Sequence, residues 1–190
     1  DPGPRFGVIE NARDGHDFVQ AAIAKGAAAV MCRKDFVTDS PQLLVVDTLD
    51  GLWKLARAAR SRFEGQVVAI TGSAGKTTMR GWLEQLLEPL GGVHASVGSY
   101  NNHWGVPLSL SRSPRAAEFG VFEVGTNHPG EIEPLSGLVA PDVALLLNVL
   151  PAHIGNFADM QALTAEKLAI ASGLSEEGTF VLPESLRDKV

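Results

Sequence analysis

The stretch VVAITGSAGKTT, residues 67 to 78, decides the fold of this chain. An apolar run leads into a glycine-rich turn that ends in Gly75-Lys76-Thr77, and such a turn between a buried strand and a helix is typical of a phosphate-binding loop. The usual form of that loop has its first glycine five positions before the second. Ile70 stands at that place, so the loop is shorter than usual. It is either a phosphate cradle or a turn that contains a solvated lysine.

The position of the turn favours a phosphate cradle. Lys76, Thr77 and Thr78 are expected to open a helix, so free backbone N–H groups and the positive end of that helix would point at one place. Lys76 would add a full positive charge, and the Thr77 hydroxyl would be available to Mg²⁺.

The pattern around this turn predicts an α/β fold. After residue 65, apolar strands at QVVAI (66–70), FGVFEV (119–124) and DVALLLN (142–148) alternate with helices, the first of which spans Met79 to Leu90 with apolar residues at spacings of three and four. Strands that are apolar on both faces predict a mostly parallel sheet with helices on both faces. A smaller α/β region precedes it, with a boundary near Glu64-Gly65.

Composition narrows the classes of partner. The chain has 190 residues, 45% of them hydrophobic, and a net charge of -6 without a long basic run, which argues against a nucleic-acid or anionic-membrane surface. No apolar stretch approaches the roughly 18 residues of a membrane span. The single cysteine, Cys32, fits a reducing compartment, so we expect a cytoplasmic location. The chain begins at Asp1 and not at methionine, so we expect a trimmed or partial product.

Glu123 is the only charged residue in FGVFEVG and ends its strand. In a parallel sheet, that end lies at the same edge as the glycine turn. A buried carboxylate needs a partner, which would be a Mg²⁺ shared with phosphate oxygens, a neighbouring arginine or a helix end.

Two further residues, His153 and Lys167, have side chains that could serve a site, but each also has a plain structural explanation. His153 follows the strand that ends at Asn148, where it is either a surface residue or a metal or phosphate ligand. Lys167 lies midway along the apolar stripe of a helix expected over residues 160 to 174, so it either snorkels to solvent or serves a site. Glu166, one position before it, points elsewhere.

Asparagines mark two loops near the same sheet edge. Asn101 and Asn102 lie in SYNNHWG, and Asn127 lies in GTNHPGE. They either form plain turns or offer neutral donors and acceptors to a substrate.

Taken in order, TGSAGKTT, SYNNHWGVPLSL, VFEVGTNHPGEI, NVLPAHIGNF and the lysine of AEKLAI resemble the motifs of the Mur ligase family. The short loop is a trait of that family, which implies ATP and Mg²⁺ as cofactors. The resemblance implies four catalytic residues, Lys76, Glu123, His153 and Lys167. It implies a nucleotide site at Gly72, Ser73, Ala74, Gly75, Lys76, Thr77 and Thr78, and substrate contacts at Asn101, Asn102 and Asn127. It implies metal ligands at Thr77, Glu123, His153 and a carbamylated Lys167. Glu166 beside the lysine and Leu168 after it depart from the usual pattern.

The resemblance also implies an activity. An enzyme of this kind forms an amide through an acyl phosphate, adding D-alanyl-D-alanine to a UDP-muramoyl-tripeptide during peptidoglycan precursor synthesis. Residues 1–64 would be a partial UDP-substrate domain and residues 65–190 a partial ATP-binding domain, with the carboxyl-terminal domain absent. We expect this piece to be inactive by itself, and the full-length protein to be a monomer. Alternatives are another Mur-type or folylpolyglutamate-synthase-like ligase, or a non-catalytic nucleotide-binding module.

Overall fold

The computed structural model describes residues 14–33, 36–151 and 154–189. The chain divides into two compact units, with the division between Lys54 and Leu55. This division falls within helix α2 (Thr48–Ser61), some residues before the boundary predicted at Glu64-Gly65. The domain assignment made from the sequence stays a prediction.

The first unit is a small α/β arrangement. It contains η1 (Gly15–Phe18), α1 (Val19–Ala24), β1 (Val30–Arg33), β2 (Gln42–Val45) and the start of α2. The Asp14 carboxylate accepts the His16 N–H and so caps η1. β1 and β2 pair in parallel, and Val19, Val30 and the free Cys32 form the core. This arrangement agrees with the smaller α/β region expected before residue 65.

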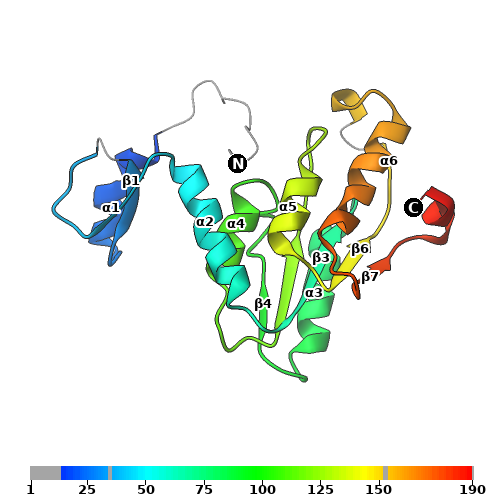
Figure 1. Cartoon of the computed structure of the whole chain (residues 1–190), viewed down its shortest axis with the longest axis horizontal. Coiled ribbons are helices and arrows are strands. Elements are labelled where there is room, and N and C mark those ends of the chain that lie inside the picture. The colour runs from blue at the N-terminus through cyan, green and yellow to red at the C-terminus, as the bar shows by residue number, and fades with distance from the viewer. Residues whose placement is uncertain (1–13, 34–35, 152–153, 190) are drawn as a thin grey trace. The chain divides into compact units, whose positions relative to one another are not determined.

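The second unit is built on a five-stranded parallel sheet (Figure 1). The strand order is β4-β5-β3-β6-β7, with bounds β3 (Gln66–Thr71), β4 (Val93–Ala95), β5 (Phe119–Glu123), β6 (Val143–Leu146) and β7 (Thr179–Val181). Ile70 on the central strand lies between Glu123 and Leu145 in register. The phosphate-loop candidate and Glu123 therefore share the carboxyl edge of the sheet, and the predicted fold class is confirmed.

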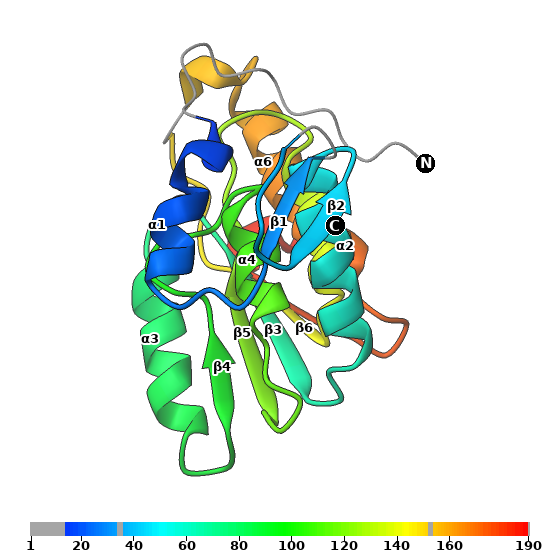
Figure 2. The same ribbon diagram turned by 90° about the vertical axis from the view of Figure 1, so that its left-hand side faces the viewer.

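Helices cover both faces of this sheet. Helix α3 (Lys76–Leu87) lies on one face, and α4 (Gly105–Ser111) and α5 (Ile132–Val139) lie on the other (Figure 2). The chain then continues through η2 (Ile154–Asn156), α6 (Met160–Leu168), η3 (Ala169–Gly173) and η4 (Glu184–Lys189). None of the helices in the described ranges has the length and hydrophobicity that a membrane crossing requires.

Two helices differ from their expected form. The helix expected over residues 160–174 is α-helical only to Leu168 and continues as a 3₁₀ helix from Ala169. On α3 the periodicity located the helix but not its buried side, since Trp82 is 58% and Leu86 is 70% exposed. Polar side chains of α3 turn toward the sheet instead, because Arg80 reaches the buried end of β5. Another helix, α4, was not predicted from the sequence.

Candidate functional site

The turn between β3 and α3 has the backbone of an anion-binding loop. Gly75 precedes the helix with φ +83°, a left-handed conformation that favours glycine, and α3 begins at Lys76 as expected. The first N–H groups of a helix have no partner within the helix. Among the described residues, no acceptor is found for the backbone N–H groups of Gly75 to Thr78. These donors are therefore available to an anion.

Asn148, at the end of the β6 region, holds the other half of this loop. The Ser73 N–H donates to the Asn148 carbonyl at 3.1 Å. The Asn148 side chain accepts the Ala74 N–H at 3.0 Å and donates its Nδ2 to the Ala74 carbonyl at 3.1 Å. The short loop is thus braced by a strand end 74 residues away, which loop spacing alone does not reveal.

Two lysines from distant elements line one pocket. Lys76 donates its Nζ to the Gly72 carbonyl at 2.8 Å, and burial lowers its pKa while the charge of Glu123 opposes that shift. Lys167 on α6 is only 4% exposed, so it does not snorkel to solvent. Burial and the nearby Lys76 charge lower the pKa of Lys167 to about 8, against the opposing effect of Glu166. A neutral amine at Lys167 is therefore accessible near physiological pH.

Glu123 lies beneath the loop and is fully buried. Its Oε2 accepts the Thr77 hydroxyl at 3.1 Å, and its Oε1 accepts Nε of Arg80 at 3.0 Å. Of the partners considered for this carboxylate, an arginine is present. Arg80 also pairs with Glu84 at 3.3 Å. The sequence signal for Arg80 was its position one helical turn after Lys76, which places it on the same side of α3.

The pocket itself is small and polar, with a volume of about 100 Å³. It is lined by Gly72, Ser73, Lys76, Asn101, Asn102, Gly125, Thr126, Asn127, Glu131 and Lys167. The structure thus brings together Gly72, Ser73 and Lys76 of the phosphate loop, Lys167, and all three asparagines for which a substrate role was predicted. Gly125, Thr126 and Glu131 were missed.

The two adjacent asparagines are placed in different ways. The Asn102 Oδ1 accepts the N–H groups of Trp104 and Gly105, so part of this amide forms the turn that leads into α4. The Asn101 side chain packs against Gly125, where an added Cβ would lie 2.6 Å from its Oδ1. A larger residue at position 125 would therefore require the Asn101 side chain to move.

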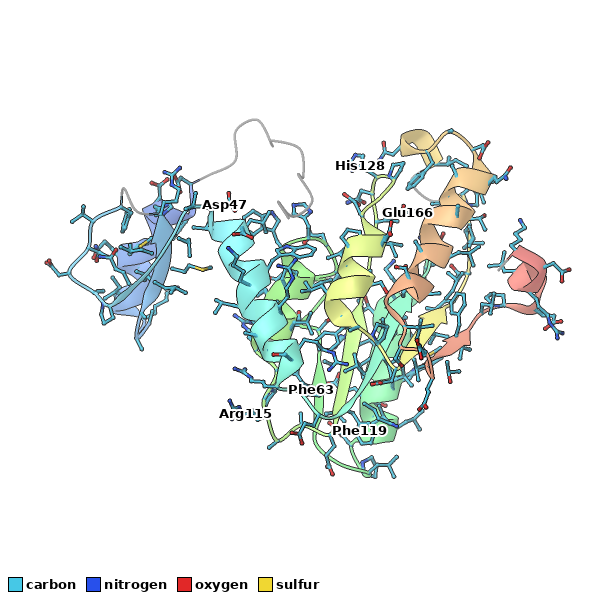
Figure 3. The ribbon with its side chains drawn as sticks, viewed as in Figure 1. Asp47, Phe63, Arg115, Phe119, His128 and Glu166 are labelled. Carbon is cyan, nitrogen blue, oxygen red and sulfur yellow. The ribbon has the colours of Figure 1, made fainter. Side chains whose placement is uncertain are left out.

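Two carboxylates hold the pocket wall opposite the loop, the segment Thr126–Ile132. The Glu131 Oε2 accepts the N–H groups of Asn127 and His128 and the Thr126 hydroxyl. Hydrogen bonds lower the pKa of Glu131 even though burial acts in the opposite direction. Glu166 on α6 accepts three further N–H groups of the segment, at the start of α5 (Figure 3).

Some expected site residues are not brought into the pocket. Ala74, Gly75, Thr77 and Thr78 are exposed and do not line it, and Glu123 is fully buried and does not line it either. His153 lies outside the described residues. Within the described ranges, no three His, Cys, Asp or Glu side chains gather as a metal-binding group.

The fold and the site define a class of protein. A parallel sheet flanked by helices carries a glycine loop at its carboxyl edge, with free N–H groups at the start of the following helix and a lysine that lines the adjacent pocket. This is the arrangement of a nucleotide-binding P-loop-type domain. Residues 70–189 match the family described as "Mur ligase middle domain". The chain belongs to the Mur ligase family.

Relatives and solved structures agree with this family. The chain is 36% identical over 182 residues to the UDP-N-acetylmuramoyl-tripeptide--D-alanyl-D-alanine ligase of Escherichia coli, covering 95% of this chain and 40% of that protein. It is 36% identical to the Bacillus subtilis ligase of the same name, over 88% of this chain and 37% of that protein. The chain therefore spans about two fifths of the length of these relatives.

A crystal structure of the Thermotoga maritima MurF ligase in complex with ADP is similar, with a TM-score of 0.79 and 36% identity. The match covers 93% of this chain and 42% of that one. The Acinetobacter baumannii MurF structure gives a TM-score of 0.77 at 33% identity, over 89% of this chain and 38% of that one.

Proposed function

We propose that this chain forms part of an ATP-dependent ligase that joins a carboxylate to an amine. The observation that carries the proposal is the pocket in which the glycine loop, two lysines and three asparagines meet above the Thr77–Glu123 pair. The names of the relatives support UDP-N-acetylmuramoyl-tripeptide and D-alanyl-D-alanine as the substrates to test first. A cytoplasmic location and a monomeric full-length enzyme belong to the same proposal.

Nucleotide binding begins at the phosphate loop. The unpaired N–H groups of Gly75 to Thr78 and the positive end of α3 attract the phosphates. The Lys76 Nζ, which donates to Gly72 in this structure, would turn to a phosphate oxygen, where a charge-assisted hydrogen bond is stronger.

The oxygen atoms beneath the loop fit a magnesium ion. Mg²⁺ prefers oxygen ligands and is commonly held by one or two protein oxygens together with phosphates and water. The Thr77 hydroxyl and the Glu123 Oε2 are adjacent and suit this role, while Arg80 holds the other Glu123 oxygen in place. When bound, the ion would stabilise charge on the phosphoryl group that is transferred.

The chemistry then proceeds in two transfers. The substrate carboxylate attacks the γ-phosphorus of ATP, which forms an acyl phosphate and releases ADP. The amine of the second substrate attacks the acyl carbon, which forms the amide and releases phosphate. Lys76 would stabilise charge on the phosphoryl group, and Asn101, Asn102 and Asn127 would orient the carboxylate substrate.

Lys167 is proposed to act as a carbamate. A neutral amine adds CO₂ and releases a proton, which replaces a buried cation with a carboxylate. The lowered pKa of Lys167 favours the neutral form that this reaction needs. The product would lie beside Lys76 with opposite charge and would offer oxygen atoms for a second Mg²⁺, together with His153.

The test is nucleotide binding by a Lys76→Met variant. It is made in a longer polypeptide, in which this chain is fused to the carboxyl-terminal part of a relative that lies beyond the matched region. We expect ATP affinity with Mg²⁺ to fall roughly 10- to 100-fold in calorimetry, because a charge-assisted contact is lost. Lys25→Met, at an exposed position outside the loop, is the matched control. Unchanged affinity in Lys76→Met would reject the phosphate role of the loop.

An amide-forming assay with ATP and the two named substrates tests the reaction itself. The 190-residue chain alone should form no product, because the relatives are more than twice its length. If the extended polypeptide binds ATP but releases no phosphate with any acceptor, the ligase proposal fails and a binding module remains.

A further inference from the structure

Glu166 is a buried carboxylate that the proposed reaction does not use. Its side chain is 8% exposed and sits on α6 directly before Lys167. Adjacent residues on a helix point about 100° apart, so the two side chains leave α6 on different sides. Within the described part of the chain, no ion pair joins Glu166 to the Lys167 amine. Lys167 lines the pocket, whereas Glu166 turns to the segment Thr126–Ile132.

The contacts of Glu166 form a compact anchor. Its Oε2 accepts the Gly130 N–H at 2.6 Å, and its Oε1 accepts the N–H groups of Glu131 and Ile132 at 3.0 and 2.8 Å. These groups open helix α5, where N–H donors lack partners within the helix and the helix dipole is positive. The negative charge of Glu166 is therefore satisfied without recruiting the neighbouring lysine.

The anchored segment is also the wall of the pocket. Thr126, Asn127 and Glu131 line the pocket, and Glu131 in turn fixes the backbone of Asn127 and His128. Glu166 thus lies at the base of a chain of contacts that runs from α6, through the start of α5, to the Asn127 loop. The same helix presents Lys167 from the other side.

We propose that Glu166 is a positioning residue that fixes the placement of Lys167 relative to the segment Thr126–Ile132 and to Lys76. It ties the helix that carries the lysine to the backbone of the segment that carries Asn127. Without this tie, the hydrogen bonds from Ser136 to the Ile170 carbonyl and from Asn156 to the Asn127 carbonyl still join neighbouring parts of these elements. Neither of them holds α6 itself to the start of α5. The catalytic part of this assignment rests on the proposed ligase function.

The test compares four forms of the 190-residue chain: wild type, Glu166→Gln, Glu166→Asp and Asp159→Asn. Glu166→Gln keeps the size but places an amide donor against N–H groups, and Glu166→Asp keeps the charge but is shorter. Asp159 is the matched control, because its Oδ1 also accepts a backbone N–H, from Ala162, at the other end of α6 and away from the pocket. Asp159→Asn therefore removes a negative charge at the start of the same helix without touching the wall.

Hydrogen exchange provides the first readout. The N–H groups of residues 130–132 should exchange about tenfold faster in both Glu166 variants, because a hydrogen bond to a charged group shifts a local opening equilibrium by roughly that factor. Asp159→Asn should leave these positions within about twofold of wild type even if its global stability falls equally. Equal acceleration in all three variants would reduce Glu166 to a general stabiliser and overturn the proposal.

Acylation of Lys167 provides a second readout, and the Asp159→Asn control separates a local release of α6 from a general loss of stability. With a small amine-reactive reagent at one fixed pH, modification of Lys167 relative to the exposed Lys25 should rise roughly threefold or more in the Glu166 variants, as α6 becomes free to turn. It should stay near the wild-type ratio in Asp159→Asn. Unchanged Lys167 labelling in Glu166→Gln would overturn the proposal. Neither readout needs ATP or substrate, so a failure of the ligase assignment would not affect this test.

Discussion

The two walls of the pocket use their backbone in opposite ways. In the phosphate loop, the N–H groups of Gly75 to Thr78 find no acceptor among the described residues, and Asn148 binds only the preceding Ser73 and Ala74. In the segment Thr126–Ile132, five N–H groups are taken up by the carboxylates of Glu131 and Glu166. The N–H donors of the phosphate loop are thus available to a ligand, whereas those of the segment Thr126–Ile132 are already bonded to carboxylates.

This difference separates the tasks of the two walls. Free N–H donors at a helix start bind an anion through the main chain, so the loop can hold phosphate with few side chains. A segment whose N–H donors are already satisfied must bind an anion through side chains such as Asn127. The hydrogen bonds to Glu131 and Glu166 instead fix the backbone conformation of this segment. We therefore expect changes at the loop to alter nucleotide binding, and changes at the opposite wall to alter stability and the placement of the carboxylate substrate.

The largest effect should come from breaking the support of the phosphate loop. In Glu123→Ala the Arg80 guanidinium, whose side chain is 15% exposed, loses its buried partner and keeps only the more exposed Glu84. Removing one member of a buried ion pair costs up to about 3–5 kcal/mol of unfolding free energy. Urea unfolding measures this loss. Glu184→Ala removes the exposed pair with Arg187 and should cost less than about 1 kcal/mol. Similar costs for the two variants would contradict the buried-support interpretation.

A smaller effect, of opposite sign, is expected at Lys167, which faces both walls. Its folded-state pKa is about 8 against an ordinary 10.5, so the folded chain binds fewer protons between these values and its stability rises with pH there. Lys167→Met should therefore stabilise the chain by roughly 2–3 kcal/mol at pH 7. The difference from wild type should shrink between pH 8 and 10.5. The exposed control Lys25→Met should show no such pH dependence, and a pH-independent gain in Lys167→Met would contradict the assignment.

Gly125→Ala tests the close contact between the opposite wall and the Asn101 loop. The added methyl group would lie 2.6 Å from the Asn101 Oδ1, and such overpacking costs about 1–3 kcal/mol. Gly81→Ala on α3 is the matched control, because no atom lies within 4 Å of its added Cβ and a helical alanine should stabilise by about 0.5–1 kcal/mol. Thermal unfolding should show opposite shifts. A change of unfolding temperature in the same direction in both variants would contradict the close contact at Gly125.

The smallest effect concerns the acid range. The pKa of Glu131 is below its ordinary value, so its contribution to stability is present above the ordinary glutamate pKa and is lost as the pH falls through the folded-state value. Glu131→Gln should therefore be less stable than wild type at neutral pH, with a difference that narrows below about pH 4.3. Glu176→Gln at an exposed position should match wild type throughout. A gap that widens toward acid would reverse the assignment.

Much of the fold was readable from the sequence because its signals are local. The apolar run before Gly72 predicted β3, and the glycine turn placed the start of α3 at Lys76. Strands apolar on both faces predicted the parallel sheet. Helix α4 escaped notice because it is short and begins beside a loop whose asparagines drew a turn interpretation. The spacing of apolar residues in α3 predicted the helix but not which side packs against the sheet. Arg80 contacts the end of β5, whereas Trp82 is exposed.

The candidate site was predicted as a set of residues and completed by partners that lie far apart in the chain. Lys76, Asn101, Asn102, Asn127 and Lys167 were chosen from local motifs, and the pocket brings them together. Their supports were not visible, because the bond from Arg80 to Glu123 spans 43 residues and that from Gly130 to Glu166 spans 36.

The sequence by itself determined the residue types that a phosphate loop, a strand-end carboxylate and a helix lysine require, since these follow from spacing within one element. Only the tertiary structure decided which donors stay free, which carboxylate caps which helix, and that Lys167 is buried beside Lys76. A hydrogen bond depends on distance and angle to within a few tenths of an ångström. That precision is reached only when distant elements pack.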